Sequence, residues 1–129
     1  MKMPQIPVSW GELYDKVTIL KIKLEKLKTK SALKNVKKEY DELIFVSNNN
    51  ISYNKDAEKL VRDLKKINNK LWNIEDRIRV KERSKVFDKD FIKLAREVYF
   101  TNDERARIKR NINMKFGSEI IKEKSYAKY

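Results

Sequence analysis

The sequence contains no cysteine and no histidine, and only two glycines and two prolines among its 129 residues. Without Cys or His it has no disulfide framework, no thiolate or imidazole metal ligands, and no Cys or His nucleophile-base pair. The shortage of Gly and Pro excludes collagen-like and linker-rich chains. There is also no Gly-rich phosphate loop and no G-x-S-x-G motif, so the sequence favours a protein that is not an enzyme and uses no metal or cofactor.

Long hydrophobic runs are absent as well. No stretch approaches the roughly 18 apolar residues of a membrane span, and residues 1–10 lack the apolar run of a signal peptide. We therefore expect a cytoplasmic protein that does not insert into membranes. The length suits a single helical domain over residues 1–129, with an extended N-terminal segment at 1–8.

The sequence carries an excess of positive charge, with 32 Lys and Arg against 19 Asp and Glu. Two origins are open. Clustered cations attract phosphates, whereas Lys, Asn and Ile, which fill 48 positions, all have AT-rich codons and can accumulate through genome composition alone. The eight arginines all lie between residues 62 and 110, where their planar forks suit carboxylate or phosphate.

Apolar residues recur at helical spacing along most of the chain. Ser9 to Glu12 has the spacing of a capping box, which marks a helix start. The predicted helices span residues 10–28, 32–47, 55–83 and 88–116. We therefore predict an all-α protein, an antiparallel bundle of long helical hairpins with coiled-coil-like heptads.

Two segments fall outside these helices. Residues 47–54 are polar and turn-prone, and we predict a surface loop there. Residues 118–129 form a tail, for which we favour a short helix docked on the bundle through Ile120, Ile121 and Tyr126.

The last long helix has a polar interruption in its apolar pattern. Folding 88–116 back on 55–83 pairs residues whose numbers sum to about 169, so that Leu64 faces Arg105. Polar side chains then occupy positions where the heptad spacing predicts apolar ones, at Asn102, Arg105 and Lys109. A buried charge is costly unless it is paired.

Two explanations of this interruption are open. In the structural one, the helix rolls so that Ile108 and Phe116 take the apolar seam, and Arg105 pairs with Glu12 or Asp15. In the functional one, the polar run lines a cleft that receives an anion or a partner carboxylate.

The same pairing places further polar and aromatic side chains halfway along the hairpin, where they orient a ligand or simply fill the bundle core. The candidate cleft residues are Trp72, Glu75, Asp76, Arg96, Tyr99, Asn102, Arg105 and Lys109. Arg107 and Arg110 belong to the densest basic run and form a candidate phosphate-binding face, although acids within pairing distance compete for them.

Four blocks of the sequence together resemble a family of small bacterial and phage proteins catalogued only as a domain of unknown function. The blocks are PVSWGELYDKVTILKIKLEKL, LWNIEDRIR, FDKDFIKLAREVYFTNDERARIKRNIN and GSEIIKEKSY. The resemblance implies an all-helical protein without an assigned activity, encoded near glycosyltransferase and surface-polysaccharide genes. The matching motif positions are Ser9, Gly11, Glu12, Asp15, Trp72, Glu75, Asp76, Arg79, Arg96, Tyr99, Asn102, Asp103, Arg105, Lys109, Asn113 and Tyr126.

Our leading hypothesis is a non-enzymatic helical adaptor or accessory protein, linked to glycan or surface-polysaccharide assembly. Its partner is a second copy or another protein, because a second apolar strip at Ile19 and Ile22 favours self-association. One alternative is nucleic-acid binding through Arg107 and Arg110. Another is a small anion or metabolite binder, or an enzyme, with an Arg-lined cleft, which resembles the helical chorismate mutases only in being helical and Arg-lined.

Overall fold

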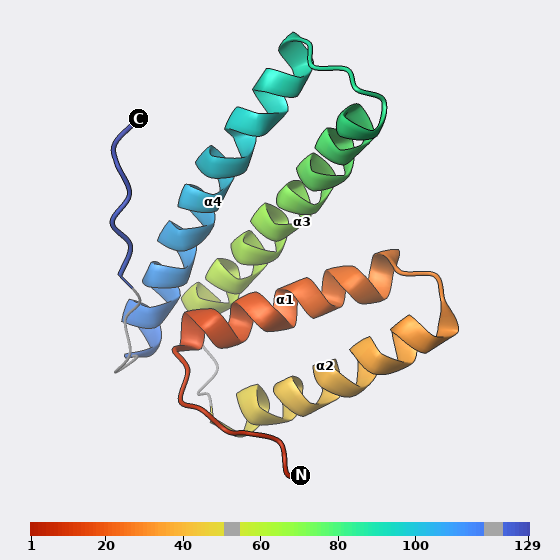
Figure 1. Ribbon diagram of the computed structural model, residues 1–129. Coiled ribbons are helices and arrows are strands. Elements are labelled where there is room, and N and C mark those ends of the chain that lie inside the picture. The colour runs from red at the N-terminus through yellow and green to blue at the C-terminus, as the bar shows by residue number, and fades with distance from the viewer. Residues whose placement is uncertain (51–54, 118–122) are drawn as a thin grey trace.

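The computed structural model describes residues 1–50, 55–117 and 123–129. Four helices, α1 (Trp10–Lys26), α2 (Lys30–Asn50), α3 (Lys55–Arg83) and α4 (Lys89–Phe116), make up the fold. There is no strand in the described residues. The predicted all-α class is confirmed, and Figure 1 shows two antiparallel helical hairpins, α1 with α2 and α3 with α4.

Helix α1 begins where the capping box predicts. The Ser9 hydroxyl accepts a hydrogen bond from the Glu12 amide at 3.2 Å, and this bond satisfies one of the amides that a helix start leaves without a partner. The helix ends at Lys26, and the backbone of Leu27 is extended. Its buried side is formed by Leu13, Val17, Leu20 and Ile22, so the second apolar strip contributes to packing within the chain.

Helix α2 differs from its prediction at both ends. It begins at Lys30 and continues to Asn50 instead of ending at residue 47. The predicted loop over 47–54 is therefore wrong for residues 47–50, because the helix continues through polar residues that lack the Gly or Pro needed to stop it. Residues 51–54 lie outside the described part of the chain.

Helices α3 and α4 form the long hairpin at the predicted positions. The Asp88 side chain caps α4 by accepting from the Phe91 amide at 2.9 Å, and Gly117 ends the helix with a left-handed φ of 65°. Ion pairs lie at both ends of the hairpin, Lys81 with Asp88 at 2.8 Å and Lys115 with Asp56 at 3.2 Å. These contacts confirm that the two helices are antiparallel.

The core of the hairpin has the rolled arrangement of the structural explanation, not the simple pairing of Leu64 with Arg105. Leu64 packs with Ile108 and Ile112, not against Arg105, and Phe116 lies against this cluster. The rings of Trp10 and Tyr14 from α1 are 5.8 Å and 5.6 Å from that of Phe116. Helix α4 is thus rolled so that apolar side chains take the seam and Arg105 lies beside it.

The two hairpins cross at one end. Helix α1 contacts α2, α3 and α4, whereas α2 contacts only α1 among the described helices. Figure 1 shows α1 crossing the end of the hairpin that holds the start of α3 and the end of α4, while the opposite tip projects beyond it. None of the helices in the described part of the chain is long and apolar enough to cross a membrane.

The described part of the tail, residues 123–129, contains no helix. It runs along α4 (Figure 1) and docks through its last residue. The Tyr129 ring lies 4.7 Å from that of Phe100, and its hydroxyl donates to Asp103 at 2.5 Å. Tyr126, which the sequence marks as a docking residue, is largely exposed instead, and Ile120 and Ile121 fall outside the described residues.

Candidate functional site

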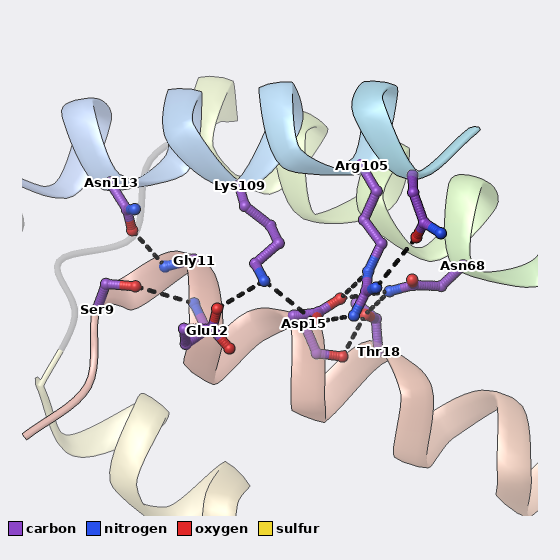
Figure 2. Close-up of polar contacts among 10 residues, drawn as sticks. Ser9, Gly11, Glu12, Asp15, Thr18, Asn68, Arg105, Lys109 and Asn113 are labelled. Atoms are coloured by element: carbon purple, nitrogen blue, oxygen red, sulfur yellow. Dashed lines mark hydrogen bonds and ion pairs between the residues drawn. The ribbon is translucent and has the colours of Figure 1, made fainter. Parts of the chain in front are cut away.

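Polar side chains gather where α1 crosses the hairpin. The carboxylate of Asp15, only 4% exposed as a residue, lies at the centre (Figure 2). Arg105 donates to it from Nε at 2.9 Å and also from Nη2, so the guanidinium binds both carboxylate oxygens in a bidentate pair. Asn68 of α3 donates to the same carboxylate at 2.9 Å. One buried acid thus joins three helices.

Lys109 extends this cluster toward the start of α1. Its ammonium group lies 2.7 Å from a Glu12 oxygen and 3.5 Å from an Asp15 oxygen. Two acids therefore face two cations, and their formal charges cancel. Together with Asn68, these four residues are called the crossing cluster below.

Around this cluster, the smaller polar groups are also satisfied. The Thr18 hydroxyl accepts from Asn68 at 3.0 Å and donates to the Asp15 carbonyl at 2.9 Å. The Gly11 amide donates to the Asn113 side chain at 2.7 Å. No buried side-chain nitrogen or oxygen in the described residues lacks a hydrogen-bond partner. The cluster is complete without a ligand, which is typical of a structural joint.

The pKa of Asp15 reflects two opposing effects. Burial alone would raise it, but the hydrogen bonds from Arg105 and Asn68, with the charges of Arg105 and Lys109, outweigh burial and hold the pKa below its ordinary value. A depressed carboxyl pKa stabilises the folded state above the unfolded pKa, and that stabilisation is lost as the pH falls through the folded pKa.

We therefore expect the free energy of unfolding to fall as the pH drops below about 4, the ordinary range of an Asp carboxyl. Urea unfolding at a series of acidic pH values measures this slope. Asp15→Asn should flatten it, whereas Asp76→Asn, at an exposed carboxylate, should leave it as in the wild type. Equal slopes in all three proteins would contradict the assignment.

The predicted cleft residues do not come together. Arg105, Lys109 and Asn102 are neighbours, since Arg105 Nη1 lies 3.5 Å from the Asn102 side-chain oxygen. Glu75 instead pairs with Arg79 on its own helix at 3.3 Å. Both side chains of this pair are exposed, so Glu75 does not join the polar group around Arg105.

Arg96 and Tyr99 lie among aromatic side chains. The guanidinium of Arg96 is 5.7 Å from the ring of Phe100, and the Tyr99 ring is 5.3 Å from that of Tyr129. Trp72 is half-buried on α3, and Asp76 is exposed near the hairpin tip. The described residues hold no group of His, Cys, Asp and Glu placed to bind a metal ion.

The two arginines of the nucleic-acid alternative are both engaged by acids. Arg107 pairs with Glu104 on its own helix, and Arg110 Nη1 lies 3.7 Å from Glu123 of the tail. Both lie beside a cavity of about 400 Å³ between α4, the start of α1 and the tail. Because each charge is partly neutralised, this face offers phosphate less attraction than the sequence predicts.

A surface that the sequence reasoning missed lies at the hairpin tip, defined here as residues 77–93. Seven Lys and Arg stand against three Asp and Glu in this stretch. Four of its large apolar residues are exposed, Val80 to 55%, Val86 to 40%, Phe87 to 55% and Ile92 to 57%, whereas Ile78 and Phe91 are partly buried. Val80, Val86 and Leu94 also line a hollow of about 460 Å³. The alternation of charged and apolar residues over 77–80 was the available signal.

The turn at the tip contains an unfavourable residue. Lys85 has a left-handed φ of 56°. Its amide donates to the Glu82 carbonyl and that of Val86 to the Lys81 carbonyl, at 3.1 Å and 3.0 Å. This is the hydrogen-bond pattern of a Schellman motif, in which glycine is the usual residue at the left-handed position. A lysine thus occupies a position where the backbone conformation favours glycine.

We expect Lys85→Gly to raise the free energy of unfolding by about 1 kcal/mol, because glycine adopts the left-handed conformation without strain. Lys85→Ala is the matched control, since it removes the same charge but retains a Cβ atom. Urea unfolding should show a gain for glycine and none for alanine. An equal gain for both would attribute the effect to charge rather than to backbone strain.

Residues 3–129 match the model of a family described as "Family of unknown function (DUF6165)". The match covers nearly all of the chain and agrees with the resemblance carried by the four sequence blocks. No curated protein and no solved structure matched the chain.

Proposed function

Because the chain belongs to this family of unknown function, its relatives supply no activity, and we propose that it is a non-catalytic interaction protein, an adaptor. Its hairpin tip binds an acidic, amphipathic segment of a protein partner. The observation that carries the proposal is the group of exposed apolar side chains at the tip, set among an excess of cations.

Two features favour this role over catalysis or anion binding. The crossing cluster balances its own charges and satisfies its own hydrogen bonds, so it lacks the unsatisfied donors that would favour a bound anion. Arg107 and Arg110 are paired with acids of the same chain. At the tip, by contrast, cations outnumber acids even though Lys81 pairs with Asp88, and this end of the hairpin lies away from α1 (Figure 1).

The chemistry of the tip defines its partner. An aliphatic or aromatic side chain can enter the hollow lined by Val80, Val86 and Leu94, and such buried anchors supply most of the affinity of an interface. Arg77 and Lys81 line the hollow together with Asp76 and Asp90. The excess of cations over the tip as a whole attracts carboxylates, which speeds association and sets orientation. An amphipathic helix with one acidic and one apolar face presents both groups. The link to glycan assembly stays a prediction from the family resemblance.

The test is an NMR titration of the isotope-labelled protein with a synthetic acidic amphipathic helix. We expect chemical shifts to change at Val80, Val86 and Phe87, with an affinity that falls as salt rises. A basic peptide with the same apolar face should bind much more weakly. Duplex DNA and vesicles of anionic lipid serve as competing probes, and stronger binding of either at the tip would overturn the choice of a protein partner.

Matched variants localise the effect. Phe87→Ala should weaken peptide binding about tenfold, the loss expected for an interface anchor. Met114→Ala removes an equally exposed apolar side chain near the other end of α4 and should leave binding unchanged. Peptide-induced shifts confined to residues outside 77–93, or no shifts at all, would contradict the proposed function.

A further inference from the structure

The second half of α2 has the opposite character to the hairpin tip. Residues 39–46 contain three acids and no Lys or Arg. Within them, two neighbouring apolar residues are exposed, Phe45 to 70% and Val46 to 45%. Asp41 and Glu42 precede Phe45 by four and three residues, so these side chains share one face of the helix. We call this the α2 acidic face.

This face has the chemistry that the hairpin tip would recognise. It presents an aromatic anchor beside carboxylates on a helix that is already folded. Asp41 already forms an ion pair with Lys37 at 2.5 Å. Glu42 therefore supplies much of the negative charge that would complement the tip. The tip in turn presents Phe87 and Ile92 among cations. Apolar area and charge of opposite sign therefore match between the two surfaces.

The two surfaces cannot meet within one molecule. Helix α2 contacts α1 alone among the described helices, and Figure 1 shows it on the side of α1 away from the projecting tip. A contact between them therefore requires two copies of the chain. Because the surfaces are different, the contact would be head to tail, and repetition gives a ring or an open chain.

We infer that the partner of the hairpin tip is a second copy of this chain, bound through the α2 acidic face. The inference rests on the proposed function, since it uses the same tip, and it names the occupant. Self-association thus arises here from exposed surfaces and not from the strip at Ile19 and Ile22, because Ile22 is buried within the chain.

Sedimentation velocity over a concentration series tests the inference. The wild type should change from a 15.5 kDa monomer to larger species as concentration rises, and added salt should reverse this. Phe87→Glu at the tip and Phe45→Lys on α2 should each remain monomeric. Circular dichroism checks that both variants keep their helices. Met114→Glu, an equally drastic change at another exposed apolar residue, should assemble like the wild type.

Mixing the two monomeric variants gives the sharpest result. Phe87→Glu retains an intact α2 acidic face, and Phe45→Lys retains an intact tip, so the mixture should form one-to-one dimers and nothing larger. A contact between two tips, or between two α2 acidic faces, cannot be restored in this way. Self-association would be overturned if the mixture failed to dimerise. It would also be overturned if the wild type stayed monomeric at about 0.5 mM, a concentration several hundred times a micromolar dissociation constant.

The same data separate this inference from the proposed function. If the wild type is monomeric but the synthetic acidic helix still shifts the tip resonances, the tip remains a docking surface and the second copy is rejected as its occupant. If the peptide also fails to bind, the proposed function falls with the inference.

Discussion

Arg105→Ala should lower the free energy of unfolding by about 3 to 5 kcal/mol, because it strands a buried carboxylate. The Asp15 side chain is 5% exposed, and its partner Arg105 is 27% exposed. Asn68 and Lys109 stay in place in the variant, but neither replaces the two hydrogen bonds that the guanidinium donates to the Asp15 carboxylate. Urea unfolding at neutral pH measures the loss.

Two controls define what the loss means. Arg107→Ala removes an arginine that is 60% exposed and pairs on its own helix, so its effect should stay within about 0.5 kcal/mol. The double variant Asp15→Leu with Arg105→Met removes both charges and should recover about half or more of the loss. If Arg105→Ala costs no more than Arg107→Ala, the Asp15 pair is not a buried structural pair.

The sequence predicted the local structure well because local structure depends on nearby residues. Ser9 and Asp88 cap the helices that their positions indicate, and Gly117 ends α4 in the left-handed conformation. The cost of burying Arg105 without a partner also led to Asp15 as one of two candidate acids. Helical periodicity and the free-energy cost of burying an unpaired charge were sufficient for these predictions.

The crossing of the hairpins was beyond such reasoning. Which face of α1 meets α3 and α4 depends on packing across the chain. Asn68 therefore gave no signal except as a polar residue in an apolar stretch, and Asn113 was marked only by the family resemblance. A heptad count alone placed Arg105 opposite Leu64, and it was the cost of a buried charge that pointed to the roll that brings Ile108 beside Leu64. The tail gave too weak a pattern to predict its docking through Tyr129.

The crossing cluster and the hairpin tip illustrate two uses of charge in one chain. In the cluster, Arg105 and Lys109 are matched by acids and hold helices together. At the tip, a lysine in the left-handed conformation lies among exposed apolar side chains and an excess of cations. A strained residue and exposed apolar groups of this kind agree with the docking surface that we propose for the tip.

Gly11 lies where the start of α1 packs closely against α4. A Cβ atom at this position would lie 2.6 Å from the backbone oxygen of Lys109 and 2.8 Å from the side-chain oxygen of Asn113. The backbone oxygen belongs to a regular helix and cannot move alone. Any larger residue therefore forces the two helices apart at the start of the crossing cluster.

We expect Gly11→Ala to lower the free energy of unfolding by about 3 kcal/mol, although the same change at an exposed helix position raises it by about 1 kcal/mol. The loss combines overpacking with damage to the hydrogen bond from Gly11 to Asn113. Asn113→Ala removes that bond without a clash and should cost about 1 to 2 kcal/mol. Thermal and urea unfolding of both variants separate the two effects. A Gly11→Ala protein as stable as the wild type would show that the helices do not meet as closely as this geometry requires.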